Sequence, residues 1–488
     1  MLKTFSEYRN KLILLPIVFI LITPILTVFS YLFHPSTELW DHLANNLLIN
    51  YLSNTLIIVF SVAFITLLIG VSSAWLVAMH KFPGKDIFKW LLVMPIAIPT
   101  YVSAYIYAGL VEPSGLLFNF ADNYLGLGEE LYRFADLRNI YGVIFILSIC
   151  LYPYVYLLCY SSFKEQSYCV LEVGRSMGLD KITCFRRINL PLARPGIVAG
   201  LSFVIMETLA EFGTVDYYGV STFTTGIFRT WFSLGDETSA LHLASLLLTF
   251  VFVIIVLEKF SRGKSQYIHT SQKSKPSEPK LLNKKDGFYA FFWCLIISAF
   301  GFIIPITQLI AWFLDTYSYI FENSYAQLLW NTTVIASMSS LLIVAVSIYF
   351  SYLNRSIKDI VTNISLKLFS LGYSIPGIVI AIGIMIPVTF LDELQSSFFG
   401  EPIFYLSGSF VALIIAYLVR FSTISFVTTE AGLSKIKNNI DLTARSFGLS
   451  KFSIIKNIHI PMMKTTIMTA LILVFVDIVK ELPATLIL

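Results

Sequence analysis

Long apolar stretches separated by short polar loops run along the whole chain. A membrane-spanning helix needs about 20 mostly apolar residues. Eleven stretches meet this length, at residues 12–33, 53–79, 87–110, 140–162, 196–215, 240–258, 288–314, 330–352, 364–389, 405–425 and 465–487. Only helices and closed barrels satisfy their backbone hydrogen bonds in lipid, so the pattern predicts an all-α integral membrane protein.

The composition agrees with this fold class. Hydrophobic residues make up 56% of the 488 residues and charged residues only 13%, whereas a soluble domain carries about 25% charged residues. The net charge of +4 is small, and the five cysteines show no metal-site spacing. We therefore expect membrane lipid around the chain and no nucleic-acid partner.

The loops between the apolar stretches alternate in charge. Residues 34–50 and 390–407 carry acidic but no basic side chains, whereas residues 164–194 and 435–464 are rich in Lys and Arg. Short basic loops stay on the cytoplasmic side of a membrane. The alternation predicts a multi-pass protein of the plasma membrane with a cytoplasmic N-terminus.

The chain contains two similar halves. Matched residues lie 277 positions apart early in the halves and 270 apart later. The pairs include Asn54 and Asn331, Pro99 and Pro376, Pro191 and Pro461, and Glu211 and Glu481. We expect a first half at residues 1–258, a basic cytoplasmic linker at 259–287 and a second half at 288–488. Both halves have the same orientation, so they form parallel repeats of about six helices with a pathway between them. The second repeat stops at Leu488, before its sixth helix.

The basic loop of the first half has a distinctive spacing. Glu172 is followed by Gly178 after five residues, Ile188 after nine more and Pro191 after a further two. Gly178 tolerates the backbone turn that would stop a short helix, and Pro191 is expected to end the loop as the next membrane helix begins. The alternative is an ordinary basic loop that only fixes the topology.

The second half repeats this spacing, which argues against the ordinary loop. The matched residues are Arg445, Gly448, Ile458 and Pro461, with Leu442 in place of the Glu and Asp441 beside it. Both loops resemble the EAA loop of ABC importer permeases. The resemblance implies a type I ABC importer permease fold, in which each loop docks on an ATPase subunit.

The energy source is expected on another chain. The sequence contains no G-x-x-x-x-G-K-[ST] phosphate-binding loop. The resemblance implies two copies of a separate ABC ATPase, with ATP bound there and no cofactor bound by this chain. No motif typical of a membrane-embedded enzyme occurs either.

Four carboxylates lie inside predicted membrane helices, where charged groups default to a functional role. They are Glu207 and Glu211 in the first half and Asp477 and Glu481 in the second. The i, i+4 spacing predicts one helix face for each pair, and the four are candidates to line the translocation pathway. Acidic oxygen-rich sites favour hard cations, so Glu207 and Glu211 are candidate metal ligands. The alternatives are pairing with Lys480, hydrogen bonding between helices, or gating.

Two stretches around these carboxylates show a closer resemblance. Residues 206–220 and 480–486 are similar to ferric iron transporter permeases, in which two halves are also fused. The resemblance implies a permease of a bacterial inner membrane that takes up ferric iron from a periplasmic binding protein. Related fused permeases carry thiamine or aminoalkylphosphonates, so these compounds are the alternative cargoes. A secondary transporter driven by an ion gradient is the alternative outside this class.

Several single residues carry further expectations. Pro95, Pro99 and Pro376 fall inside predicted helices, where proline produces a kink. Arg420 is placed near a cytoplasmic helix end and is expected to extend toward water. His242 is expected to be exposed at the membrane interface.

Overall fold

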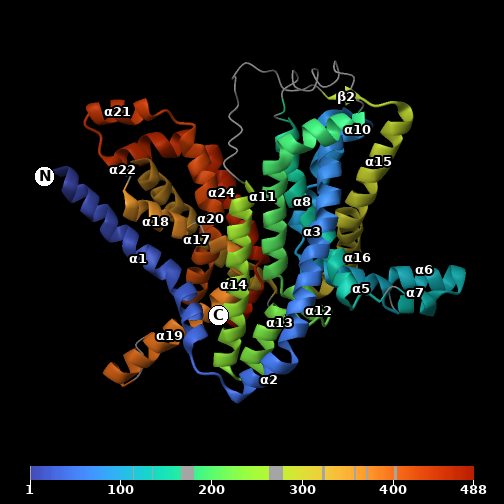
Figure 1. The fold of residues 1–488 in the computed structure, drawn as a ribbon, viewed down its shortest axis with the longest axis horizontal. Helices are drawn as coiled ribbons and strands as arrows, with labels where there is room; N and C mark the ends of the chain where they lie inside the picture. Colours follow the sequence, from blue (N-terminus) through green and yellow to red (C-terminus); the bar gives the residue numbers. More distant parts are fainter. Residues whose placement is uncertain are drawn as a thin grey trace. The chain divides into compact units, whose positions relative to one another are not determined.

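The fold is a set of long helices, several of which are broken within the apolar stretches (Figure 1). The structure is a computed structural model. It describes all residues except 1, 114, 135, 165, 167–180, 263–278, 321–324, 357–358, 370–371 and 401–403.

The first half and the linker contain the following elements. They are α1 (Leu2–Ser30), α2 (Glu38–Asn46), α3 (Leu48–Met79), β1 (His80–Lys81), α4 (Lys85–Leu91), α5 (Thr100–Val111), α6 (Leu116–Leu125), α7 (Gly128–Phe134), α8 (Ile140–Lys164), α10 (Lys181–Cys184), α11 (Leu190–Ala210), α12 (Gly213–Tyr217), α13 (Phe223–Phe228), α14 (Glu237–Arg262) and β2 (Lys280–Leu281). The two short strands pair in parallel, with His80 opposite Lys280.

The described elements of the second half are all helices. Its elements are α15 (Lys284–Ser298), α16 (Ile304–Ile320), α17 (Tyr325–Ser356), α18 (Ile360–Phe369), α19 (Gly377–Phe399), α20 (Phe410–Ser434), α21 (Asn438–Ser446), α22 (Lys451–Ile454), α23 (Ile460–Met462), α24 (Lys464–Lys480) and α25 (Pro483–Ile487).

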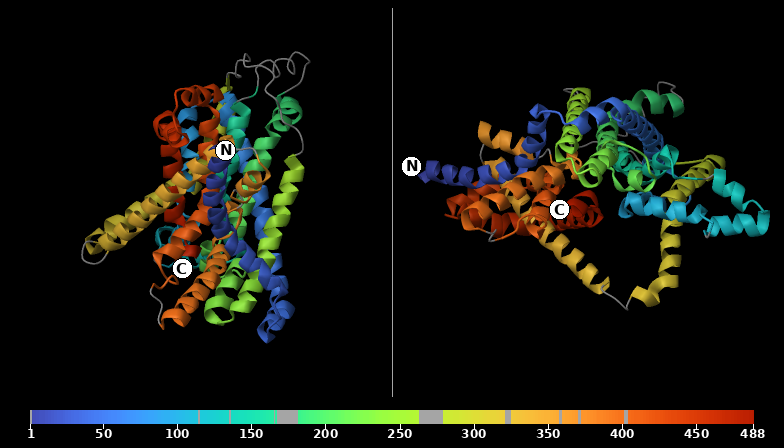
Figure 2. Two further views of the ribbon diagram at one scale, coloured as in Figure 1. Left: turned by 90° about the vertical axis from the view of Figure 1, so that its left-hand side faces the viewer. Right: turned by 90° about the horizontal axis from the view of Figure 1, so that it is seen from below.

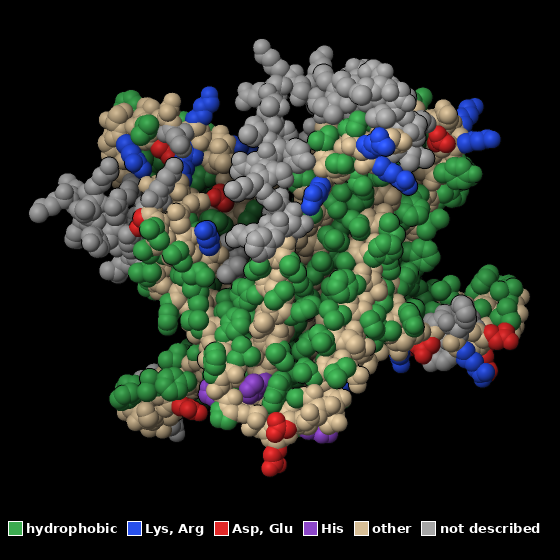
Figure 3. Space-filling model, in the orientation of Figure 1, with side chains coloured by type: hydrophobic (Ala, Val, Ile, Leu, Met, Phe, Trp, Pro, Cys, Tyr) green, Lys and Arg blue, Asp and Glu red, His purple; other side chains and the backbone are tan. Residues whose placement is uncertain are grey.

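The predicted membrane class is confirmed by the length and composition of these helices. Among the described residues, nine helices are long and apolar enough to cross a bilayer, and two bent pairs raise the number to as many as eleven. One bent pair joins residues 85–97 to 100–125 with a bend of 95°, and the other joins Ile455–Met462 to Lys464–Lys480 with a bend of 76°. Hydrophobic side chains cover most of the visible helix surface in Figure 3.

The chain divides into two compact units. One unit comprises residues 41–229 and 249–318, and the other comprises residues 1–40, 230–248 and 319–488. The core of the first unit is a three-helix arrangement of α3, α8 and α11. Gly70 on α3 and Gly200 on α11 both lie against Val155 of α8, where an added Cβ would come within 2.7 Å of that residue. Small residues at these positions let the helices approach closely.

The second unit repeats this core with the matching helices α17, α20 and α24. In each unit the long helix that opens the other repeat is packed against this core. Helix α1 packs against α19, α18 and α20, as the blue and orange helices show in two further views (Figure 2). Helix α15 packs against α3 and α4. Helix α1, from the first half of the sequence, therefore belongs to the compact unit of the second half, and α15, from the second half, belongs to the compact unit of the first half.

The bend expected at Pro95 and Pro99 is present, but all three prolines lie at the starts of helices and not in helix interiors. Pro95 lies in the 3₁₀ turn Met94–Ala97, and Pro99 and Pro376 are the N-cap residues of α5 and α19. Proline has no N–H to donate and a fixed φ, so it is tolerated at a helix start and disfavoured in the interior. The matched prolines thus begin new helices.

One capping interaction outside the membrane spans involves an ionisable group. Asp236 precedes α14 and accepts hydrogen bonds from the Ser239 N–H at 3.0 Å, the Ser239 hydroxyl at 2.8 Å and the Thr37 hydroxyl at 2.8 Å. Burial alone would raise the pKa of Asp236, but these hydrogen bonds outweigh it and hold the pKa below its usual value.

We predict a pH-dependent effect of Asp236→Asn. A carboxylate with a depressed pKa stabilises the fold above its unfolded pKa of about 4, and this contribution is lost as the pH falls through the folded pKa. The variant should therefore unfold at a lower temperature than the wild type at pH 7, and the difference should shrink toward pH 3. The exposed neighbour Glu237→Gln is the control. Equal melting temperatures of wild type and variant at pH 7 would contradict the prediction.

Candidate functional site

The carboxylate at the end of α11 joins three chain segments. The helix ends at Ala210, and Glu211 has an extended backbone with φ −67° and ψ 127°. One carboxylate oxygen accepts a hydrogen bond from the Thr214 N–H at 2.8 Å, which caps α12. The other accepts a hydrogen bond from the Thr100 hydroxyl at 2.7 Å, at the first residue of α5.

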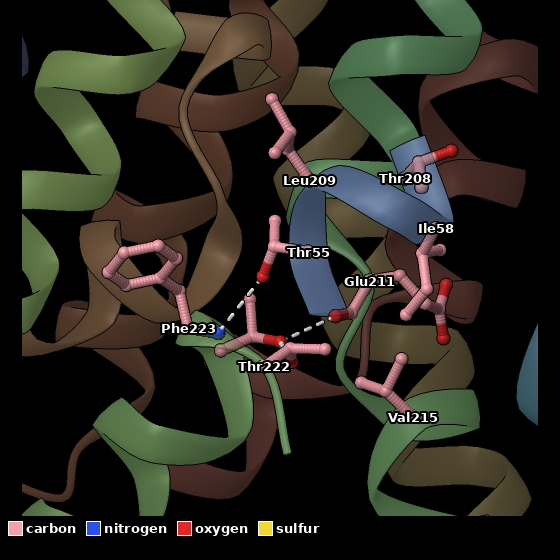
Figure 4. A pocket seen from close by; sticks show the side chains of 9 residues that line it. Thr55, Ile58, Thr208, Leu209, Glu211, Val215, Thr222 and Phe223 are labelled. Atoms are coloured by element: carbon pink, nitrogen blue, oxygen red, sulfur yellow. Dashed lines mark hydrogen bonds between the residues drawn. The ribbon is translucent and has the colours of Figure 1, made fainter. Parts of the chain in front are cut away.

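Threonines hold the backbone of Glu211 from the other side. The Thr224 hydroxyl donates to the main-chain carbonyl of Glu211 at 2.7 Å. The Thr55 hydroxyl accepts from the Phe223 N–H at 3.4 Å, and Figure 4 shows these residues around a small cavity. The cavity has a volume of about 10 Å³, the room for about one water molecule. The threonine hydrogen bonds stabilise the break after α11, and the cavity is too small for a bound cargo molecule.

The second repeat has the same break with a different partner. Helix α24 ends at Lys480, and Glu481 has φ −73° and ψ 114°. Its carboxylate accepts a hydrogen bond from the Ala484 N–H at 3.3 Å. It also forms an ion pair with the Arg420 guanidinium of α20 at 3.2 Å, and both residues are less than 10% exposed.

A glycine makes room for this ion pair. An added Cβ on Gly377, the first residue of α19, would clash with the Glu481 carboxylate and with the Arg420 guanidinium. Any side chain at position 377 would therefore separate the two charged groups or move the start of α19.

The structure places the second carboxylate of each pair directly after its helix. Helix α11 ends at Ala210 and α24 at Lys480, so Glu211 and Glu481 are the C-cap residues. Glu207 and Glu211 lie in one compact unit, and Asp477 and Glu481 lie in the other. Asp477 pairs with Lys480 at 3.1 Å, as one alternative anticipated. No group of three or more His, Cys, Asp or Glu residues within the described part of the chain is arranged to hold a metal ion. The pathway and metal roles of these residues stay predictions.

Two polar residues lie in different surroundings from those expected. Arg420 does not extend toward water, because it is buried in the middle of α20 against Glu481. His242 is 6% exposed, stacks on Trp40 at 4.8 Å between ring centroids, and contacts the Thr238 carbonyl. A single charged or polar residue in an apolar stretch does not reveal which distant side chain will pair with it.

The second basic loop forms a short helix followed by a turn. Gly448 follows α21 with a φ of +79°, and its N–H donates to the Arg445 carbonyl at 3.0 Å. This left-handed conformation favours glycine. Gly448, the repeat mate of Gly178, therefore ends a short helix in the way that we predicted for Gly178. Gly178 and Glu172 lie outside the described residues.

The ends of the two loops share an unusual helix geometry. Ile188 and Ile458 lie at the same place in matching π-helical segments, Phe185–Asn189 and Ile455–His459. Pro191 lies in the first turn of α11, at the start of the membrane helix as predicted, and the π segment before it continues directly into that helix. Pro461 lies at the start of α23, and the chain bends two residues later, at Met463. The first π segment thus leads straight into its membrane helix, whereas the second is separated from its membrane helix by a bend of 76°.

A buried ionic network anchors the second loop. The Arg355 guanidinium of α17 donates to the Asp441 carboxylate at 2.8 Å and to the carbonyls of Leu433 and Ile436 at 2.7 and 2.8 Å. The same carboxylate contacts His459 Nε2 at 2.7 Å. Asp441 therefore points inward and ties α21 to the helix bundle.

The loop surface that remains outside this network is apolar in part. Leu442, the residue that replaces Glu172, is 62% exposed, and Phe447 is 81% exposed. The sequence analysis noted Asp441 beside the missing Glu but did not assign it a partner. Pairing Asp441 with Arg355 from the sequence would have required knowing that α17 packs against this loop.

We predict that Arg355→Met loosens this loop. The variant leaves Asp441 largely buried without its guanidinium partner, and breaking a buried ion pair in this way typically costs about 3–5 kcal/mol. Hydrogen–deuterium exchange of residues 438–446 should become faster, while exchange in the middle of α8 should not change. Lys456→Met, at an exposed position of the same loop, is the matched control. Unchanged exchange in Arg355→Met would show that other contacts hold α21.

The fold and the repeated loops define a class of protein, namely a multi-pass all-α membrane component built from two related halves. The profile of the family described as "Binding-protein-dependent transport system inner membrane component" matches residues 66–262 and 343–488, and the chain belongs to this family. The two matched segments confirm the predicted duplication. The prediction of an ABC transporter permease, a transport subunit rather than an enzyme, is likewise confirmed.

Individual relatives extend over most of the chain. It is 25% identical over 445 residues to the Fe(3+)-transport system permease protein FbpB 2 of Haemophilus influenzae, covering 90% of this chain and 80% of the relative. It is 21% identical over 491 residues to the ferric transport system permease protein FbpB of Actinobacillus pleuropneumoniae, covering 95% and 69%. The similarity to the sulfate permease protein CysT of Salmonella typhimurium, 25% over 181 residues, covers 36% of this chain and 61% of that relative.

Proposed function

We propose that the chain is the membrane-spanning permease of an ATP-driven importer for ferric iron. The observation that carries the cargo assignment is the extent of the likeness to proteins named as ferric permeases, which spans 90–95% of this chain. The sulfate and spermidine/putrescine permeases match only 36–38% of it. Thiamine and aminoalkylphosphonates stay as competing cargoes for the transport test.

The partners follow from the same proposal. A periplasmic binding protein delivers the ferric ion, and two copies of a separate ATPase bind and hydrolyse ATP. The ATPases dock on the loop that contains Glu172 and Gly178 and on the loop of α21. This orientation places the N-terminus in the cytoplasm of the bacterium and the chain in the inner membrane. The inward anchoring of Asp441 supports this role, because a docking element must be rigidly tied to the helices that it moves.

Transport in liposomes tests the proposal directly. The permease is reconstituted with its ATPase, and radiolabelled ferric ion is supplied on the binding protein. We expect uptake that requires ATP and that excess thiamine or aminoalkylphosphonate does not reduce. Uptake that follows an ion gradient without ATP would instead identify a secondary transporter. ATP-dependent uptake of thiamine or a phosphonate without iron uptake would overturn the cargo assignment.

A substitution in the second loop tests the coupling. Gly448→Val places a β-branched residue at a φ of +79°, which costs about 1–2 kcal/mol of conformational energy, so the end of α21 should shift. We expect iron uptake to fall about tenfold or more while ATP hydrolysis continues. Gly448→Asn is the matched control, since Asn tolerates the left-handed conformation. Normal uptake by the Val variant would contradict a coupling role for this turn.

A further inference from the structure

A second, much larger pocket lies in the compact unit that contains α3, α8 and α11. Its volume is about 630 Å³, within the range of about 300–1,000 Å³ that ligand sites in proteins have. Two distant segments form it, residues 81–83 between β1 and α4 and residues 281–292 from β2 into α15. The pairing of β1 with β2 joins these segments, and the Leu282 N–H donates to the Lys81 carbonyl at 3.1 Å. The helix breaks and the two basic loops do not account for this pocket.

The wall of the pocket is largely aromatic. Phe82, Phe288, Phe291 and Phe292 line it, and the ring centroids of Phe288 and Phe292 are 4.4 Å apart. Phe288 and Phe292 are 59% and 41% exposed, and Ile296, four residues further along α15, is 52% exposed. Side chains spaced four residues apart share one face of a helix. An exposed apolar stripe therefore leads from the pocket along α15.

The polar edge of the same pocket is basic. Lys81 and Lys284 line it, and both are exposed. Within the part of the chain that the structure describes, neither lysine forms an ion pair. Further positive charge lies nearby, since Lys81 and Lys164 both repel Lys85, and Asp86 attracts it. The pocket thus places positive charge beside an aromatic wall.

The pocket lies where three candidate membrane spans have their ends. The span Leu48–Met79 ends two residues before Lys81, the span Ile140–Lys164 ends at a lysine, and the span Lys284–Tyr317 begins at one. Lysines at the ends of membrane helices extend toward the headgroup region. Figure 3 shows Lys and Arg side chains at this end of the helices, next to their hydrophobic surface. A ligand in the pocket would have its polar end at the membrane surface and its apolar end along α15.

We propose that this pocket binds an anionic phospholipid, with the phosphate at Lys81 and Lys284 and an acyl chain along Phe288, Phe292 and Ile296. Such a lipid matches the basic edge and the apolar stripe together. A soluble anion would leave the stripe uncovered, and a zwitterionic lipid would bring no net negative charge to the lysines. The bound lipid contacts both segments of the pocket and so holds α15, which comes from the second half of the sequence, against α4 and β1. The inference depends on the membrane location alone and is independent of the cargo.

Photo-cross-linking to the purified full-length permease tests this site. The probes are phosphatidylglycerol and phosphatidylcholine, each carrying a diazirine in the acyl chain, and mass spectrometry measures labelling of residues 288–296 as each lipid is titrated. We expect half-maximal labelling by phosphatidylglycerol at an about tenfold lower concentration than by phosphatidylcholine. The double variant K81Q/K284Q should lose this preference, because each lysine near the surface contributes to binding anionic lipid. K435Q/K456Q removes two exposed lysines of the second basic loop and should behave as wild type.

A second variant fills the pocket without changing its charge. Gly287 lines the pocket, and an added Cβ would meet Pro83, Phe82 and Leu282 at 3.7–4.0 Å, which are ordinary contact distances. The helix therefore accepts a side chain there, and the further atoms of a leucine would occupy the space of the lipid. Gly287→Leu should reduce labelling about tenfold or more at a fixed concentration of phosphatidylglycerol, whereas Gly287→Ala should stay within about twofold of wild type. The melting temperature of each variant checks that the fold is kept.

Four outcomes would overturn the inference. Equal labelling by the two lipids shows no selection of an anionic headgroup. An equal loss of preference in K81Q/K284Q and K435Q/K456Q shows a general attraction of lipid to basic loops. Wild-type labelling of folded Gly287→Leu places the lipid elsewhere, and wild-type protein without labelling shows that another part of the chain covers the pocket. None of these results bears on ferric uptake, so the proposed function is tested separately.

Discussion

Both repeats depend on how a broken membrane helix satisfies its backbone groups. Lipid offers no hydrogen-bond partners, so the N–H groups that begin the short helix after each break need acceptors. Glu211 and Glu481 provide carboxylate oxygens at 2.8 and 3.3 Å. The same carboxylates lie against the residues that follow Pro99 and Pro376, where a second break occurs. In each repeat, one side chain therefore connects two breaks that come from distant parts of the sequence.

The shared geometry is maintained by two different kinds of interaction. In the first repeat a hydroxyl donates to a carboxylate, a bond that contributes about 1.5–3 kcal/mol. In the second repeat a buried arginine faces the carboxylate, and loss of one partner there costs about 3–5 kcal/mol. Gly377 is part of the second solution, because the guanidinium and the carboxylate fill the space that a side chain would need. Duplication has preserved the position of the break while the chemistry that stabilises it has diverged.

The sequence predicted the membrane class and the duplication, and the spacing match identified Gly448 as the mate of the predicted helix stop Gly178, because each depends on local pattern or on matched spacing. The prolines indicated a kink within residues 87–110, but not that the helix ends there and a new one begins after a bend of 95°. The breaks after Ala210 and Lys480 were not predicted. The sequence also missed the partners of Arg355 and Arg420, since ion pairs between helices depend on packing that no local pattern specifies.

The repeats also differ in how movement would pass from the cytoplasmic loop to the helix break. In the first repeat one helical run extends from Phe185 to Ala210, about 39 Å at 1.5 Å per residue, and Glu211 follows it directly. A displacement of its π-helical end would therefore shift the carboxylate as part of the same rigid element. In the second repeat a bend of 76° near Met463 interrupts the corresponding path. The carboxylate with neutral donors is thus the one attached to the continuous helix, so the asymmetry of charge coincides with an asymmetry of mechanical connection.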